Sequence, residues 1–119
     1  MTHVLLITGA GRGIGAATAK LAGARGYDVG VTYKSDAKSA ADVVAAVKAK
    51  GRNAVAIAAD MGREADVERM FKEADALGRL THFVYNAGIP GVAGRLETAD
   101  SGMMREVIDV NVLGALWSM

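Results

Sequence analysis

Apolar and polar residues follow one another along the chain in blocks that predict strands and helices in alternation. Short runs rich in Val, Leu, Ile and Ala predict strands that are covered on both faces, because such strands have no polar side. These runs lie at 3–7, 28–33, 53–60 and 81–88. The segment 63–78 instead repeats apolar residues at the spacing of a helix. Its predicted inner stripe comprises Val67, Met70, Phe71, Ala74 and Leu77.

Glycines and polar caps set the predicted ends of the first two helices. The first helix is expected from about residue 14 to 25, where Gly26 would end it. The second is expected to run to Lys50. Ser35 or Ser39 could cap its N-terminus, because a hydroxyl oxygen accepts a hydrogen bond from the first turn.

The order of these elements predicts an α/β fold, with a doubly wound parallel sheet and helices on both faces. The sequence contains no internal repeat and no low-complexity linker, so one domain over residues 1–119 is expected. A fourth helix is predicted to start at Ser101. No terminating signal follows Trp117 and Ser118, and we expect the chain to stop inside this helix.

Residues 8–15, TGAGRGIG, join the first predicted strand to the first predicted helix. In such a strand–turn–helix unit, Gly9 would allow the tight turn and Gly13 would let the backbone approach a pyrophosphate. Gly15 would let the helix pack closely on the strand. The start of the helix would offer free N–H groups and the positive end of its dipole to phosphate. The alternative is a glycine-rich turn without a ligand.

Composition and charge narrow the classes of protein to consider. The 14 Lys and Arg residues nearly balance 13 Asp and Glu residues, so no nucleic-acid surface is expected. There is no Cys, and hence no thiolate chemistry or disulfide framework. The chain shows neither a leader nor a membrane-spanning segment, which favours a cytoplasmic protein without a membrane partner. His3 and His82 have no metal-ligand spacing, so no metal site is expected.

Four motifs occur in a characteristic order along the chain. They are TGAGRGIG (8–15), ADM (59–61), YNAG (85–88) and VNVLG (110–114). In this order and context the sequence resembles the N-terminal half of the short-chain dehydrogenase/reductase family. The resemblance implies a Rossmann-type NAD(P)-binding domain. It also implies an oxidoreductase that transfers hydride between a nicotinamide cofactor and the carbonyl or alcohol group of a small-molecule substrate.

The resemblance assigns roles to individual residues. Asp60 would bond the adenine amino group, and Asn111 would be the first member of a catalytic Asn-Ser-Tyr-Lys tetrad, holding a water in a proton relay. The alternative for Asn111 is a polar residue that kinks the helix. The expected cofactor-binding residues are Thr8, Gly9, Arg12, Gly13, Ile14, Gly15, Tyr33, Lys34, Asp60, Met61, Asn86, Ala87 and Gly88.

The end of the second strand bears on the choice of cofactor. An acidic residue there marks NAD, because it bonds the ribose hydroxyls and repels a 2′-phosphate. Tyr33 stands at that position, Lys34 follows it, and Arg12 lies in the glycine loop. Two cations suit a 2′-phosphate, so NADP is favoured over NAD. The competing interpretation uses Asp36 as the NAD-selecting acid, although Asp36 also suits the first turn of a helix.

The remaining members of the tetrad are not in the chain. None of Tyr27, Tyr33 and Tyr85 has a Lys four residues later. The chain would therefore carry the cofactor-binding half of the enzyme and be inactive alone. The alternative is a non-catalytic nucleotide-binding module or a degenerate fragment. Made alone, residues 1–119 are expected to be poorly soluble, because the fourth strand would form a bare apolar edge.

The residue pattern of the fourth predicted helix also indicates that several copies of the chain associate. It has apolar residues on more than one face, and in the family the corresponding helix joins partner subunits. A homodimer or homotetramer through residues 103–119 is therefore expected. The apolar residues concerned are Val107, Ile108, Val112, Leu113, Leu116 and Trp117.

Overall fold

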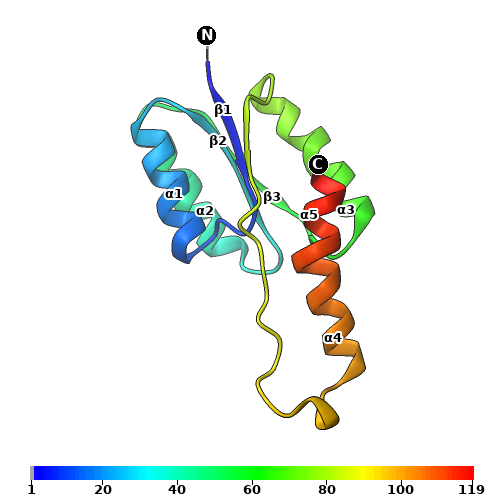
Figure 1. Ribbon diagram of the computed structural model, residues 1–119. Helices are drawn as coiled ribbons and strands as arrows, with labels where there is room; N and C mark the ends of the chain where they lie inside the picture. Colours follow the sequence, from blue (N-terminus) through cyan, green and yellow to red (C-terminus); the bar gives the residue numbers. More distant parts are fainter. Residues whose placement is uncertain (1) are drawn as a thin grey trace.

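A computed structural model describes residues 2–119. Its strands form one parallel sheet in the order β3-β2-β1-β4 (Figure 1), which confirms the predicted doubly wound α/β fold. The strands are β1 (Val4–Ile7), β2 (Asp28–Tyr33), β3 (Ala54–Ala58) and β4 (His82–Val84). The α-helices are α1 (Gly13–Ala24), α2 (Ala37–Lys48), α3 (Glu64–Ala74), α4 (Ser101–Ile108) and α5 (Gly114–Ser118).

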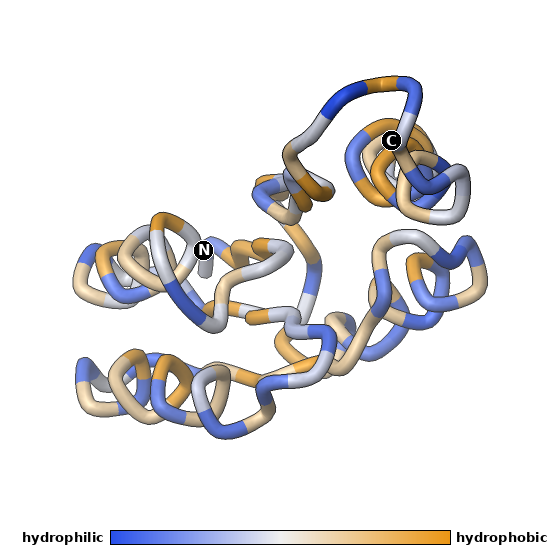
Figure 2. The backbone as a smooth tube through the Cα atoms, turned by 90° about the horizontal axis from the view of Figure 1, so that it is seen from below, coloured by the Kyte–Doolittle hydropathy of each residue, from blue (hydrophilic) through white to orange (hydrophobic). Residues whose placement is uncertain are grey.

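The helices lie on both faces of the sheet. In Figure 1, α1 and α2 cover one face, and α3 lies on the other with the C-terminal helices. The view from below in Figure 2 shows the same separation, and hydrophilic and hydrophobic residues alternate along the helices. Helices α1, α2 and α3 therefore each turn one side to the interior and one side to solvent.

β1 supplies the centre of both halves of the core. Leu5 and Ile7 pack into the cluster formed with α1 and α2. Leu6 points to the opposite face, where it packs with Ile57 of β3 and Met70 of α3. Successive residues of a strand point to opposite faces, so a strand buried on both faces has no polar position. This explains the uninterrupted apolar run in the sequence.

The ends of the first two helices follow local glycine and capping chemistry. Helix α1 ends at Ala24, and Gly26 takes a φ of 92°, as expected for a glycine that terminates a helix. The prediction that Ser35 or Ser39 caps α2 was wrong. Asp36 is the N-cap, and its carboxylate accepts a hydrogen bond from the backbone N–H of Ser39. A carboxylate at this position also interacts with the helix dipole.

Several other elements are shorter than predicted. Helix α2 ends at Lys48, two residues before the predicted Lys50. Strand β3 lacks the predicted ends of 53–60, and a 3-10 turn at Asp75–Leu77 follows α3. Strand β4 spans only three residues of the predicted 81–88. Beyond Val84, the backbone N–H groups of Asn86 and Ala87 bond to the Thr8 side chain rather than to the backbone of β1, and the ladder has ended.

The predicted fourth helix is present, but it is not α-helical throughout. It consists of α4, a π-helical turn (Asp109–Leu113) and α5. The long loop before it extends well beyond the sheet, and α4 returns beside this loop (Figure 1). No helix within residues 2–119 is both long and apolar enough to cross a membrane.

Candidate functional site

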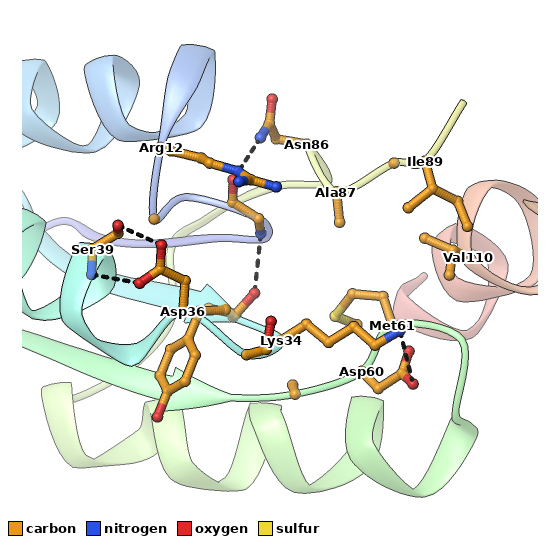
Figure 3. A pocket seen from close by; sticks show the side chains of 17 residues that line it. Arg12, Lys34, Asp36, Ser39, Asp60, Met61, Asn86, Ala87, Ile89 and Val110 are labelled. Atoms are coloured by element: carbon orange, nitrogen blue, oxygen red, sulfur yellow. Dashed lines mark hydrogen bonds and ion pairs between the residues drawn. The ribbon is translucent and has the colours of Figure 1, made fainter. Parts of the chain in front are cut away.

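A pocket of about 410 Å³ opens at the carboxyl ends of the strands. The segments that follow β1, β2, β3 and β4 all contribute to it, together with Val110 of the π-helical turn (Figure 3). In open parallel sheets, this edge is where ligands bind. The predicted cofactor residues that line the pocket are Gly9, Arg12, Tyr33, Lys34, Asp60, Met61, Asn86, Ala87 and Gly88.

Thr8, Gly13, Ile14 and Gly15, predicted with that set, do not line the pocket. Thr8 is fully buried, whereas the side chain of Ile14 is 80% exposed. Sequence reasoning also missed several lining residues, because glycine, alanine, hydroxyl and aliphatic side chains give no distinctive chemical signal of their own. These are Gly11, Thr32, Ser35, Ser39, Ala59, Ile89 and Val110.

Thr8 connects the glycine loop to the segment after β4. Its hydroxyl oxygen accepts hydrogen bonds from the backbone N–H groups of Asn86 and Ala87, both at 3.0 Å. The side-chain amide of Asn86 donates in turn to the carbonyl of Gly9 at 3.1 Å. Two segments far apart in sequence are thus held together at the floor of the pocket.

Two glycines make this close approach possible. Gly9 has a φ of 63°, and a Cβ there would lie 2.9 Å from the Cα of Ala87. Gly15 faces the same junction, where a Cβ would collide with the Asn86 amide and the Gly9 carbonyl. The predicted roles of these glycines in the turn and in helix packing therefore agree with the geometry.

The start of α1 beside the pocket is open. Arg12, its N-cap, makes no side-chain capping bond, and the first turn contains no acidic residue. A Cβ added to Gly13, which has a φ of 61°, would meet no atom within 4 Å. An uncapped helix start with open space before it fits a phosphate group, because its N–H groups and dipole favour an anion.

The end of β2 brings opposite charges to the rim of the pocket. Asp36 lines the rim, but both of its oxygens are engaged by Ser39, Oδ1 by the backbone N–H at 3.1 Å and Oδ2 by the hydroxyl at 2.6 Å. The Ser39 hydroxyl is the largest cause of the lowered pKa of Asp36, and Arg12 contributes to it. Lys34 extends along the pocket toward Asp60 (Figure 3).

Asp60 and Met61 form a fixed turn after β3. The backbone N–H of Asp60 donates to Asp66 Oδ2 at 2.8 Å, and this bond holds the pKa of Asp66 below its usual range. Gly62 donates to Asp60 Oδ1 at 2.9 Å, and Met61 is only 4% exposed. Sequence reasoning missed Asp66, although an acid six residues after Asp60 in the first turn of a helix was a possible signal.

The side chain of Asn111 binds backbone rather than pointing freely into the pocket. Its Nδ2 donates to the carbonyl of Ile89 at 2.8 Å, and its Oδ1 accepts from the N–H of the same residue at 2.9 Å. Asn111 lies in the π-helical turn. The Asn111 Oδ1 would lie 3.4 Å from a Cβ at Gly88, which lines the pocket.

The π-helical turn is held from the sheet side by Tyr85. The phenol donates to the carbonyl of Val110. Burial raises the pKa of Tyr85, and the negative charge of Asp60 adds to this, so the phenol stays protonated as a donor at neutral pH. At Gly114, a Cβ would overlap the carbonyl of Met61 and the Tyr85 hydroxyl, so only glycine fits. Such single π-helical turns occur frequently at functional sites.

Comparisons with known proteins agree with this geometry. The family model described as short chain dehydrogenase matches residues 3–119. A curated relative, the short chain dehydrogenase/reductase nsrJ of Aspergillus novofumigatus, is 41% identical over 112 residues, which are 93% of this chain and 42% of the relative.

Solved structures give the same result. A short chain dehydrogenase from Burkholderia cenocepacia in complex with NADP is 38% identical with a TM-score of 0.93, over 98% of this chain and 47% of that one. A blue fluorescent protein from a metagenomic library, in complex with NADPH, is 35% identical with a TM-score of 0.88, over 98% and 48% respectively. The chain thus spans about half the length of the proteins it matches. Because the family match covers nearly every residue, the chain belongs to the short-chain dehydrogenase/reductase family.

Proposed function

We propose that this chain is the cofactor-binding part of an oxidoreductase that transfers hydride between NADP(H) and the carbonyl or alcohol group of a small molecule. The observation that carries the proposal is the pocket at the carboxyl ends of β1 and β4. An uncapped helix start lies at one side of the pocket, and Arg12 and Lys34 lie on its rim. When bound, the nicotinamide supplies or accepts the hydride.

The chain's own residues would bind and orient the dinucleotide. The open start of α1 would accept the pyrophosphate through backbone N–H groups. Asp60 lines the pocket and is fixed by Gly62 through Oδ1, so its Oδ2, which lies 3.8 Å from Lys34 Nζ, can accept a hydrogen bond from the adenine amino group. Met61, Ala87 and Val110 provide apolar surface between these polar groups.

The rim of the pocket favours NADP over NAD. Tyr33 occupies the place of a ribose-binding acid, and the nearby Asp36 already uses both oxygens to cap α2. Arg12 and Lys34 are the cations that line the pocket within the described residues, and charge-assisted bonds to phosphate are strong. Two related structures were solved with NADP and NADPH. These observations together support NADP as the cofactor.

Asn111 would act through its backbone. Its side-chain amide binds the backbone of Ile89 through both Nδ2 and Oδ1, so we assign the water to its main-chain carbonyl in the π-helical turn. The hydrogen bonds of the Asn111 side chain would then hold this carbonyl in position. The Ser, Tyr and Lys that would complete the proton transfer are not among these 119 residues.

The exposed face of the C-terminal helices supports a homo-oligomer. Met104, Ile108, Val112 and Leu116 repeat every fourth residue and are each 45–58% exposed. An apolar stripe of this kind on a helix is typical of a subunit interface. We propose that it contributes to a homodimer or homotetramer.

Equilibrium binding tests the proposed function. The protein in its naturally encoded length is titrated with NADPH and NADH, and the quenching of Trp117 or the nicotinamide fluorescence is followed. Tighter binding of NADPH, with oxidation of NADPH by a panel of ketones and aldehydes, is expected. Tighter binding of NADH would contradict the cofactor assignment. Binding without turnover of any carbonyl would favour a non-catalytic nucleotide-binding module.

A further inference from the structure

Lys34, which lines the pocket, forms ion pairs with two carboxylates, that of Asp60 in the pocket lining and that of Glu106 on α4. Its Nζ lies 3.3 Å from Glu106 Oε1 on α4 and 3.8 Å from Asp60 Oδ2 after β3. Glu106 precedes Val110, which lines the pocket, by one helical turn. The same ammonium that would bind a 2′-phosphate is therefore already engaged across the mouth of the pocket.

We propose that Glu106 is a specificity-determining residue, which competes with the 2′-phosphate of the cofactor for Lys34 and so limits the preference for NADP(H). This inference rests on the proposed function, because it assumes that the pocket takes a dinucleotide. Glu106 lies on neither the glycine loop nor the end of β2, the two places whose residues usually determine cofactor preference.

The geometry gives Asp60 and Glu106 different roles. Asp60 is fixed by the backbone N–H of Gly62 and is 3.8 Å from the ammonium, beyond hydrogen-bond distance. Glu106 hydrogen-bonds to Lys34, and within residues 2–119 this is its sole ion-pair partner. The competing effect of Glu106 therefore acts through Lys34, and Asp60 remains available to the adenine.

The exposure of Lys34 and Glu106 limits how much their ion pair can change the affinity for the cofactor. The side chains of Lys34 and Glu106 are 58% and 43% exposed, so water and salt screen the pair. Exposed pairs of this kind correspond to changes of about two- to fivefold in a binding constant. Glu106 should therefore adjust the cofactor preference rather than abolish binding.

A purely structural role predicts a different outcome. If the ion pair only fastened α4 to the end of β2, its loss would weaken every ligand of the pocket and lower the melting temperature. Competition for Lys34 instead affects only ligands with a 2′-phosphate. Two nucleotide fragments separate these cases, namely adenosine 2′,5′-bisphosphate and adenosine 5′-diphosphate.

The test measures the binding of both fragments by titration calorimetry, using the protein in its naturally encoded length. Glu106→Gln keeps the shape of the side chain and removes its charge. We expect it to tighten the 2′,5′-bisphosphate about two- to fivefold at low salt, with the 5′-diphosphate unchanged. The gain should vanish at about 0.5 M salt and in a Lys34→Gln background. Glu68→Gln, an exposed acid on α3, makes the same charge change away from the pocket and should change nothing.

Two results would overturn the proposal. In the first, Glu106→Gln binds the 2′,5′-bisphosphate as tightly as the unaltered protein does, whereas Lys34→Gln binds it more weakly. This result would leave the proposed preference for NADP(H) intact. In the second, Glu106→Gln binds both nucleotide fragments more tightly, and by the same factor. If the unaltered protein shows no preference for the 2′,5′-bisphosphate and Lys34→Gln has no effect on it, the proposed NADP preference itself fails, together with this inference.

Discussion

Thr8, directly after β1, accepts a hydrogen bond from the backbone N–H of Ala87 at 3.0 Å, although 79 residues separate them. The hydroxyl is fully buried and also accepts the N–H of Asn86. Because β4 ends at Val84, these two bonds continue the connection between the strands where the ladder has stopped. The Thr8 hydroxyl oxygen therefore helps to hold the floor of the pocket, together with the bond from the Asn86 amide to the Gly9 carbonyl.

Replacing Thr8 by Val keeps the shape of the side chain but leaves two N–H groups without their acceptor. We expect Thr8→Val to lower the free energy of unfolding by about 2 kcal/mol, the cost of unsatisfied buried donors. Binding of NADPH should weaken as well. Thr8→Ser retains the oxygen and should restore most of the stability, and urea unfolding of both variants checks this. Equal losses in the two variants would show that packing of the methyl group matters more than the hydroxyl.

The glycine loop gives a second prediction. Gly9→Ala introduces a Cβ at a φ of 63°, only 2.9 Å from the Ala87 Cα. The backbone conformation alone should cost about 1–2 kcal/mol, and the close contact should add to it. Gly94→Ala is the control, because a Cβ there would meet nothing within 4 Å. Thermal unfolding should show a large decrease for the first variant and little change for the second.

The charge of Lys34 is expected to determine much of the cofactor preference. Lys34→Asp should reduce the preference for NADPH over NADH by about tenfold or more, since it removes a charge-assisted bond and adds repulsion. Lys20→Asp on the exposed surface of α1 makes the same change in charge at a distance from the pocket. Fluorescence titration of both variants measures the ratio of the dissociation constants for NADH and NADPH. A ratio that changes equally in the two variants would reflect net charge alone.

Asp66 predicts a dependence of stability on pH. Its pKa is lowered in the folded protein, chiefly by the backbone N–H of Asp60. A carboxyl with a lowered folded pKa contributes stability above its unfolded pKa, about 3.9, and loses it as the pH falls through the folded value. Asp66→Asn should therefore be less stable than the unaltered protein at pH 7, and the difference should shrink below about pH 4.

Chemical unfolding at pH 7 and pH 3 measures this difference. Asp75→Asn is the matched control, because Asp75 is exposed. A destabilisation by Asp66→Asn that is the same at both pH values would show that the charge of Asp66 is not responsible.

If the exposed apolar residues of α4 and α5 form a subunit interface, charged residues placed among them should disrupt the oligomer. Ile108→Glu combined with Leu116→Glu should separate subunits, because two buried charges would face a partner surface. Light scattering on the protein in its naturally encoded length should then report a smaller species than for the unaltered protein. Leu21→Glu, at a residue of α1 that is 53% exposed, should leave the mass unchanged. A monomer before any substitution would contradict the proposed assembly.

The sequence by itself determined the order of elements and the place of the glycine loop. Apolar runs such as 3–7 require burial on both faces, and the positive φ values of Gly9, Gly13 and Gly26 are conformations that other residues rarely adopt. These requirements are local, so they can be read one segment at a time. Nine of the thirteen expected binding residues line the pocket, and they make up nine of its seventeen lining residues.

Tertiary structure decided how those residues are used. The roles of Thr8 and Glu106 depend on partners that are 79 and 72 residues away, and no local pattern specifies such pairings. The choice of Asp36 over Ser35 or Ser39 as the cap depended on the path of the chain leaving β2. Asn111 lies in a π-helical turn that contacts with Ile89 and Tyr85 help to hold, whereas helix propensity alone predicts an α-helix there.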